Sequence, residues 1–320
     1  MSSFNNYLET VGEIGYVKSV QGYLVHCSGL AGARISEKVY FEDDQIGFVD
    51  SIGPDSTSIL LLDGRSIGFG KMVVRTGERL TASVSNDFLG RVVDVFGNPL
   101  DGRGKVKNIV ERELDPPAVP MIDRERTTEN LETGVTLVDL LIPLGKGQRQ
   151  LVMGDQKTGK TSFLMQLVAR QTQLGAVCIY ASIAKKQADL VSILERLKEL
   201  GAMEKTVVVA AGASAPSSLI YLAPFYAFSL AEHFRDQGKD VLIILDEISR
   251  HAKYYREISS LERKMPGREG YPGDIFHMHA HLMERAGRFI IGKGEVGKET
   301  LTLAVKGKTA SITCFPVVQT

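Results

Sequence analysis

Residues 154–161 read GDQKTGKT, which matches the pattern G-x-x-x-x-G-K-[ST], and the strand-like run QLVM precedes them. In such a loop, Gly154 and Gly159 let successive backbone N–H groups face phosphate oxygens, and the N-terminus of the following helix adds partial positive charge. Lys160 supplies a mobile charge, and the Thr161 hydroxyl can contact Mg²⁺. The octapeptide therefore predicts a nucleoside triphosphate site rather than a glycine-containing turn that binds nothing. The residues expected to hold the nucleotide are Gly154, Asp155, Gln156, Lys157, Thr158, Gly159, Lys160, Thr161 and Ser162.

A second candidate lies at the end of an apolar run. The sequence VLIILDE at 241–247 is apolar up to Asp246 and Glu247, as in a buried strand of a parallel sheet. Such strands end at the same edge of the sheet, where the phosphate loop also lies. We therefore expect Asp246 and Thr161 to lie on the magnesium side of the nucleotide. The alternative is a solvated strand end without a ligand.

Other ionisable residues carry weaker signals. His277, His279 and His281 alternate, which would suit a metal on a strand, but residues 275–285 favour a helix that scatters these side chains over different faces. Several lysines in residues 291–309 could contact RNA, but the segment lacks interleaved aromatic residues and favours an exposed hairpin. Five arginines could each contact a phosphate or a partner, and spacing does not choose among them: Arg250, Arg256, Arg263, Arg268 and Arg285.

Composition indicates an ordinary globular protein. The chain has 320 residues, 43% hydrophobic and 24% charged, which suits two domains. Its 38 basic and 38 acidic residues cancel, so no nucleic-acid partner is expected. No apolar run reaches the about 18 residues of a membrane span, and the first residues lack a secretory signal, so we expect a cytoplasmic protein. Three isolated cysteines favour reduced, buried thiols: Cys27, Cys178 and Cys314.

The chain changes character near residue 148. Short β-type runs with turn residues between them fill residues 15–79 and predict a small antiparallel barrel. Residues 89–106 resemble a strand and turn, and a proline-rich linker follows at 115–120. We predict an α/β P-loop nucleotide-binding domain with a parallel, RecA-like sheet after the barrel. Its expected strands are 177–182, 206–211 and 241–247, and its helices 161–174, 187–200 and 217–235. The expected domains are 1–80 (barrel), 81–147 (junction and linker) and 148–320 (nucleotide domain).

Several motifs in order resemble the alpha subunit of the F-type rotary ATP synthase. They are residues 133–162, YLAPF at 221–225, LIILDEIS at 242–249 and residues 266–286, with LGRVVDVFGNPLDG at 89–102 resembling the junction between barrel and core. The resemblance extends roughly from Val11 to Thr320. The GDxxTGKT form is similar to alpha subunits rather than to the catalytic beta subunits, whose loop resembles GGAGVGKT.

The resemblance implies a hexamer in which alpha and beta subunits alternate around a central stalk, peripheral to the inner (plasma) membrane. Alpha subunits of that family bind Mg-ATP (or ADP) at noncatalytic sites. Where beta subunits carry a glutamate that polarises the attacking water, alpha subunits usually carry Gln, and this sequence has Lys185. We therefore predict a proton-translocating synthase subunit without catalytic residues of its own. Lys185 is expected to meet the γ-phosphate or a neighbouring acid, or to be an exposed surface lysine.

The sequence departs from the family pattern in several places. Its start shows no counterpart of the family's amphipathic N-terminal helix, and Gln156 and Lys157 stand where alpha subunits commonly have Arg and Gln. Residues 289–308 are longer than the glycine-rich loop usual there. The last residues, PVVQT, match the family's PVIET, so the C-terminal helical domain and the arginine lent to the beta site are expected to be missing, as in a truncated gene, a fragment or a shortened paralogue. Two other functions stay open: an autonomous ATPase motor of the flagellar, secretion-export or Rho-like kind, and a nonfunctional remnant.

Overall fold

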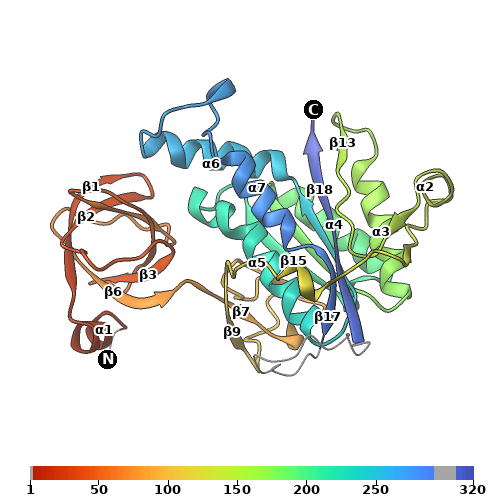
Figure 1. Cartoon of the computed structure of the whole chain (residues 1–320), viewed down its shortest axis with the longest axis horizontal. Helices are drawn as coiled ribbons and strands as arrows, with labels where there is room; N and C mark the ends of the chain where they lie inside the picture. Colours follow the sequence, from red (N-terminus) through yellow and green to blue (C-terminus); the bar gives the residue numbers. More distant parts are fainter. Residues whose placement is uncertain (1–2, 292–307) are drawn as a thin grey trace.

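The computed structural model describes residues 3–291 and 308–320 and places a small barrel beside a larger α/β part (Figure 1). The barrel is closed and antiparallel, with the strand order β1-β2-β5-β4-β3-β6. Closure pairs every strand on both sides and leaves no open edge. The predicted barrel is therefore confirmed. Its strands are β1 (Ile14–Gln21), β2 (Leu24–Ser28), β3 (Glu37–Phe41), β4 (Ile46–Ile52), β5 (Thr57–Leu61) and β6 (Met72–Arg79).

A short helix, α1 (Ser3–Thr10), packs against the barrel. Phe4 is 3% exposed and lies in a cluster with Tyr40 and Val74, and the ring of Tyr7 stacks on Tyr40 with centroids 5.6 Å apart. The backbone N–H of Phe4 donates to Asp44 Oδ1 at 3.0 Å. The sequence did not predict this short helix, because its apolar residues find a docking surface on the barrel that the local pattern does not reveal.

The junction forms two small sheets of its own and adds two strands to the core sheet. Within it, β7 (Thr81–Val84) pairs with β9 (Val110–Glu113), and β11 (Asn130–Leu131) pairs with β12 (Leu144–Gly145). Two short strands join the core sheet instead: β8 (Val92–Val93) and β10 (Arg124–Glu125). Our domain boundaries at residues 80 and 147 remain a proposal. The remaining elements of this region are η1 (Asn86–Phe88), η2 (Met121–Asp123) and α2 (Thr136–Leu141).

The core sheet has the order β10-β17-β18-β16-β14-β15-β8, and β13 also pairs with β18. The strands β18, β16, β14, β15 and β8 run parallel, whereas β17 is antiparallel to β18. The predicted α/β nucleotide-domain fold is confirmed, with an antiparallel edge added. Residues 292–307, the larger part of the expected hairpin at 291–309 and including the run LTLAV, lie outside the described residues. The core strands are β13 (Val152–Gly154), β14 (Val177–Lys185), β15 (Thr206–Gly212), β16 (Val241–Asp246), β17 (Gly287–Ile291) and β18 (Lys308–Gln319).

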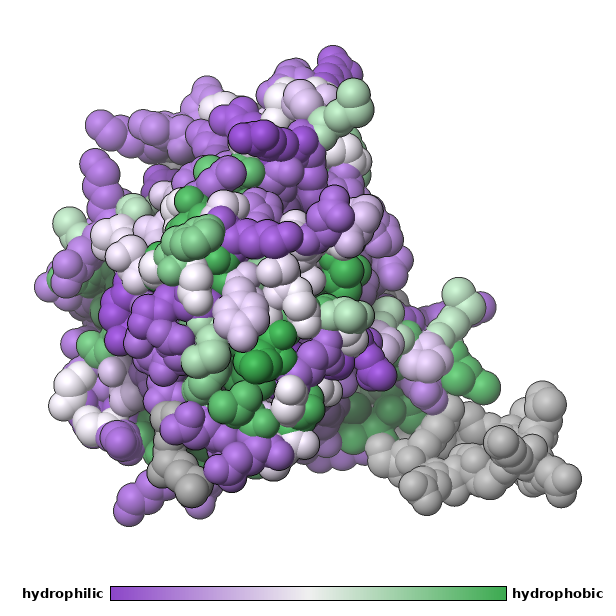
Figure 2. Space-filling view, turned by 90° about the vertical axis from the view of Figure 1, so that its left-hand side faces the viewer, coloured by the Kyte–Doolittle hydropathy of each residue, from purple (hydrophilic) through white to green (hydrophobic). Residues whose placement is uncertain are grey.

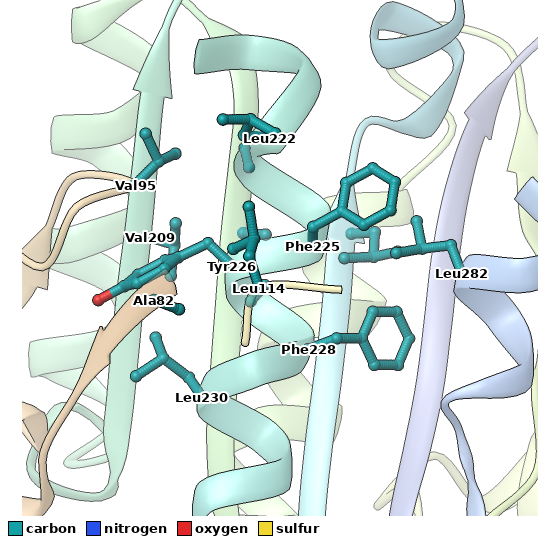
Figure 3. Packing of buried hydrophobic residues seen from close by; sticks show 14 of the residues in the cluster. Ala82, Val95, Leu114, Val209, Leu222, Phe225, Tyr226, Phe228, Leu230 and Leu282 are labelled. Carbon is teal, nitrogen blue, oxygen red and sulfur yellow. The ribbon is translucent and has the colours of Figure 1, made fainter. Parts of the chain in front are cut away.

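Helices cover both faces of this sheet, so its strands are apolar on both sides. On β14, Ile179 and Ala181 belong to a cluster with α5, α6 and α7, whereas Cys178 and Tyr180 belong to a cluster with α3 and α4. Figure 3 shows Tyr226 of α5 beside Ala82 and Val209, and Phe225 and Phe228 facing Leu282 of α7. The helices are α3 (Lys160–Gln173), α4 (Gln187–Glu199), η3 (Met203–Lys205), α5 (Ser217–Asp236), α6 (Ile248–Leu261), η4 (Arg268–Gly270) and α7 (Ile275–Glu284).

Polar contacts join the C-terminal end of α6 to the barrel. Ser51 Oγ donates to Glu262 Oε1 at 3.0 Å, and Lys264 Nζ lies 3.4 Å from Asp50 Oδ2. The surface at the barrel end mixes hydrophilic residues with scattered apolar ones (Figure 2). Exposed apolar side chains of the barrel include Tyr16, Ile35, Ile52 and Phe69. No helix in the described part of the chain is long and apolar enough to cross a membrane.

Candidate functional site

The phosphate loop lies between the end of β13 and the start of α3. Gly154 ends the strand, Asp155 to Gly159 form the loop, and Lys160 begins the helix. Two loop residues have left-handed backbones, Lys157 with φ of 62° and Gly159 with φ of 93°. A Cβ added to Gly159 would meet no atom within 4 Å, so the glycine is required there for its backbone conformation and not for space. The turn thereby leads the chain into α3 with the first helical N–H groups unbonded within the helix, where anions bind.

Lys160 folds back over its own loop. Its Nζ donates to the carbonyl oxygens of Gly154 and Asp155, both at 2.6 Å. Thr158 Oγ1 also donates to the Asp155 carbonyl, at 2.8 Å. Among the described residues, no carboxylate lies within ion-pairing distance of Lys160. Its charge is therefore not neutralised by the protein and is available to an anion at the helix N-terminus.

The loop opens into a cavity of about 640 Å³, a size typical of ligand sites. Its lining has more positive than negative charge, with five basic and three acidic side chains. The basic residues are Lys157, Lys160, Lys185, Lys186 and Arg250, and the acidic ones are Asp189, Asp246 and Glu247. The predicted residues from Gln156 to Ser162 all line it. Gly154 and Asp155 do not; Asp155 Oδ1 instead accepts a hydrogen bond from Thr320 Oγ1 at 2.6 Å.

Asp246 ends β16 at the same edge of the sheet and is 3% exposed. Its Oδ2 accepts a hydrogen bond from the hydroxyl of Tyr180 and lies 2.9 Å from Nζ of Lys185. Burial, followed by the nearby charge of Asp246, raises the pKa of Tyr180 well above its ordinary value, so the phenol keeps its proton and donates. Asp246 is thus a buried carboxylate with a resident cation.

Lys185 reaches Asp246 because β14 contains an irregularity at its end. The register against β15 shifts between Ile183 and Lys185, and Ala184 between them has a positive φ of 52°. Regular alternation would place Lys185 on the α5 face with Ile183, because successive strand residues face opposite sides. The extra residue turns Lys185 to the face of Asp246 instead. Arg250 Nη1 donates to the Ala184 carbonyl at 2.7 Å and holds this geometry.

Sequence reasoning missed several residues of the cavity. Asp189, Ser192 and Ile193 lie on α4 at spacings of three and four, so one face of that amphipathic helix lines the cavity. Glu247 directly follows Asp246, and its Oε1 accepts from Ser249 Oγ at 2.5 Å. The helical spacing on α4 was a usable signal. Val317 and Gln319 also line the cavity because β13 pairs with β18. The local sequence carries no signal for this pairing.

The histidines and arginines singled out in the sequence are divided between two regions. α7 forms where residues 275–285 predicted a helix, and His281 Nε2 lies 2.9 Å from Asp115 Oδ1. His279 lies near His251 of α6, with 3.2 Å between the ring nitrogens. Of the five arginines, Arg250 lines the cavity, whereas Arg285 is buried in the core. The cavity and the histidine cluster are therefore separate features.

The arrangement fits the chemistry of a nucleotide phosphate chain. An uncompensated lysine, two left-handed loop residues and a helix N-terminus together favour negatively charged oxygens. The Thr161 hydroxyl and the Asp246 carboxylate are donor types that Mg²⁺ prefers, and both residues line the same cavity. Asp246, however, already shares its charge with Lys185. A metal would have to share this carboxylate with an ammonium group.

Comparison with known proteins gives a consistent result. A family model described as "ATP synthase alpha/beta family, nucleotide-binding domain" matches residues 134–320. The chain is 38% identical over 307 residues to "ATP synthase subunit alpha" of Marinobacter nauticus, covering 96% of this chain and 59% of that protein. It is 40% identical to "ATP synthase subunit alpha 2" of Hahella chejuensis with the same coverage. For "ATP synthase subunit alpha" of Caldanaerobacter subterraneus, identity is 38% over 321 residues, 100% of this chain and 60% of the relative. The chain thus spans about 59% of the length of such relatives.

Proposed function

This chain belongs to the ATP synthase alpha/beta family, and from that premise we propose that it is an alpha-type subunit that binds Mg-ATP or ADP without hydrolysing it. One observation carries the proposal. At the end of β14, where catalysis would call for a carboxylate to activate water, the chain has Lys185, which is ion-paired with Asp246 at 2.9 Å. A protonated ammonium cannot accept a proton from water.

In this proposal the loop residues from Gly154 to Ser162 surround the phosphates. Lys160 leaves its two carbonyl partners to meet the β- and γ-phosphates, and backbone N–H groups at the start of α3 contact the remaining oxygens. Thr161 and Asp246 are the metal-side residues for Mg²⁺, which when bound neutralises phosphate charge. Lys185 is paired with Asp246 and lines the same cavity as Lys160, so its ammonium group would also face the phosphates.

The cavity has two further carboxylates, Glu247 and Asp189, which differ in whether they are free to act as a general base. Glu247 is 7% exposed, accepts from Ser249 and lies 3.5 Å from Arg250 Nε, so it is already engaged. Asp189 is exposed in the first turn of α4 and lines the cavity. Asp189 is therefore the residue that keeps the alternative of an autonomous ATPase motor open, because it could act as a general base in place of a glutamate.

The names of the relatives support a place in a larger assembly. We propose that the chain alternates with beta-type subunits in a hexamer around a central stalk, and that it meets the membrane as a peripheral part of a proton-translocating synthase on its cytoplasmic side. Catalysis would then occur at sites completed by the beta partner. A chain that binds no nucleotide would instead be the nonfunctional remnant.

Binding and turnover of ATP by the full 320-residue chain test the proposal. Calorimetric titration with ATP and MgCl₂ is expected to show one site, and Lys160→Ala is expected to weaken it by at least about tenfold, the loss that follows removal of a charged contact of about 1.4 kcal/mol. Lys157→Ala removes an exposed charge from the same loop and should weaken binding less.

The same preparation is then assayed for phosphate release. The proposal expects no magnesium-dependent turnover above that of Lys160→Ala. Turnover that disappears in Lys160→Ala and in Asp189→Asn would establish the autonomous ATPase instead. Absence of ATP binding by a folded chain would support the remnant.

A further inference from the structure

Three observations place a fixed positive charge where the metal of this site would act. Lys185 Nζ lies 2.9 Å from Asp246 Oδ2, and the two side chains are 12% and 4% exposed. The hydroxyl of Tyr180 donates to the same oxygen, so Oδ2 is engaged by two protein donors. The backbone around Ala184 and its hydrogen bond from Arg250 direct Lys185 to this position. The ion pair is therefore built into the end of the strand and does not rest on a flexible surface side chain.

Charge at this position has a direct consequence for ligand binding. A free Asp246 would repel the phosphates of ATP and attract Mg²⁺, so nucleotide and metal would bind together. With Lys185 beside it, the carboxylate is neutralised before any ligand arrives, and the ammonium faces the cavity shared with Lys160. Repulsion of the phosphates and attraction of the metal both fall.

We propose that Lys185 substitutes for part of the role of Mg²⁺, so that this chain binds ATP with little dependence on magnesium. The inference rests on the proposed nucleotide site and concerns how strongly the ATP affinity of that site depends on Mg²⁺. Removal of Lys185 restores an unpaired Asp246 and with it a strong requirement for Mg²⁺. Lys185 is a positioning and charge-neutralising residue in this account, and no chemical step passes through it.

The test measures the dissociation constant of ATP by calorimetry in EDTA and in MgCl₂, and divides the value in EDTA by the value in MgCl₂. In Lys185→Gln this ratio is expected to exceed that of the unmodified chain by at least about tenfold, in the range found when close charge pairs are broken. Equal ratios in the two proteins overturn the inference. Lys186→Gln is the matched control: it removes the same charge from an exposed neighbour in the same cavity, and its ratio is expected to equal that of the unmodified chain.

A second variant covers failure of Lys185→Gln to fold, since that change leaves a buried carboxylate without its cation. Lys185→Gln combined with Asp246→Asn removes both charges. Its magnesium ratio is expected to stay within about threefold of the unmodified chain, because the net charge of the pair is zero before and after the change. A ratio that falls by tenfold or more would show that ATP binding by the unmodified chain depends strongly on Mg²⁺ through Asp246 despite Lys185, and would overturn the inference.

The two proposals fail in different ways. Loss of all Lys160-dependent ATP binding would overturn the nucleotide site itself, and with it the role given to Lys185. Strong Lys160-dependent binding with an unchanged magnesium ratio in Lys185→Gln would leave the nucleotide site standing and overturn the inference about Lys185 alone.

Discussion

Arg285 and Glu232 form a two-point ion pair inside the core. Arg285 Nε lies 2.9 Å from Glu232 Oε1 and Nη2 lies 3.0 Å from Oε2, with the side chains 1% and 4% exposed. Nη1 donates to the Leu114 carbonyl at 2.9 Å, and Nη2 to Ser229 Oγ at 3.1 Å. One guanidinium therefore joins the end of α7 to α5 and to the junction segment, and its hydrogen bonds to Glu232, Ser229 and the Leu114 carbonyl are buried.

Replacement of Arg285 by Met is expected to lower the free energy of unfolding by about 3–5 kcal/mol, because it leaves Glu232 as a buried, unpaired charge. Urea denaturation measures the change. Arg196→Met is the control, since Arg196 pairs with Glu199 on the surface of α4 and such pairs contribute up to about 1 kcal/mol. Similar losses in the two variants would contradict this account of Arg285.

Stability is expected to fall in mild acid because of His251. Its Nε2 lies 2.9 Å from the Tyr221 carbonyl and must carry the proton, so Nδ1 accepts from His279 Nε2. Burial, and then the proximity of His279, lowers the pKa of His251 to about 3. In the unfolded chain His251 is protonated near its ordinary pKa of 6.5, whereas in the folded chain it stays neutral down to about pH 3. The stability that depends on the neutral ring is therefore present above pH 6.5 and is lost as the pH falls toward 3.

The expected loss between pH 7 and pH 5 is about 2 kcal/mol from this one group. Urea denaturation at the two pH values measures it. His251→Gln keeps a donor for the Tyr221 carbonyl but cannot be protonated, so its stability should depend less steeply on pH. His277→Gln, an exposed position on α7, should retain the full dependence. Equal slopes for His251→Gln and the unmodified chain would contradict the assignment.

Gly147 is expected to tolerate no side chain. Its φ is +92°, and an added Cβ would come within 2.8 Å of the backbone of Gly287 and Arg288 at the start of β17. Gly175 has a similar φ of +95°, but a Cβ added there would meet no atom within 4 Å. Comparing the two positions therefore separates the cost of the left-handed backbone from the cost of the steric clash. Gly175→Ala should cost about 1–2 kcal/mol for the left-handed backbone. Gly147→Ala should cost about 1–3 kcal/mol more, as overpacked sites do. Equal urea midpoints would contradict the collision.

The three cysteines are expected to be inert in the folded chain. All are free and buried, and burial raises the pKa of Cys27 to about 12 and those of Cys178 and Cys314 further. Thiolate is the reactive form, so little is available at neutral pH. A chromogenic disulfide reagent should titrate no thiol in native buffer and three in denaturant. Rapid reaction of one thiol in the native protein would show that its part of the core opens.

Patterns confined to a few neighbouring residues were readable from the sequence. The short β-type runs within residues 15–79 predicted the barrel, the apolar runs predicted β14, β15 and β16, and GDQKTGKT predicted the loop between β13 and α3. Each of these signals comes from a local period or a local turn requirement. The burial of the three cysteines also followed from their apolar surroundings.

Features set by distant contacts were not readable. The strand expected within 89–106 forms as β8, but its pairing with β15, more than a hundred positions away, was not predicted, and α1 is held by Tyr40 and Val74 of the barrel. The helix α6 was not predicted, because only Ile248, Tyr255 and Ile258 among its buried residues are apolar. The position of Lys185 depends on a left-handed Ala184, and alanine carries no sequence signal for a positive φ.

That alanine gives the last prediction. Ala184 is 3% exposed and adopts a φ of 52°, a conformation that costs an L-residue about 1–2 kcal/mol and glycine almost nothing. Ala184→Gly should therefore be neutral or stabilise the chain by up to about 1 kcal/mol, the strain relief being partly offset by the greater entropy of glycine in the unfolded chain. Ala181→Gly, in the same strand without a positive φ, should destabilise by about 1 kcal/mol or more. Urea denaturation distinguishes the two, and equal losses would mean that the bend at Ala184 is not a strained feature of β14.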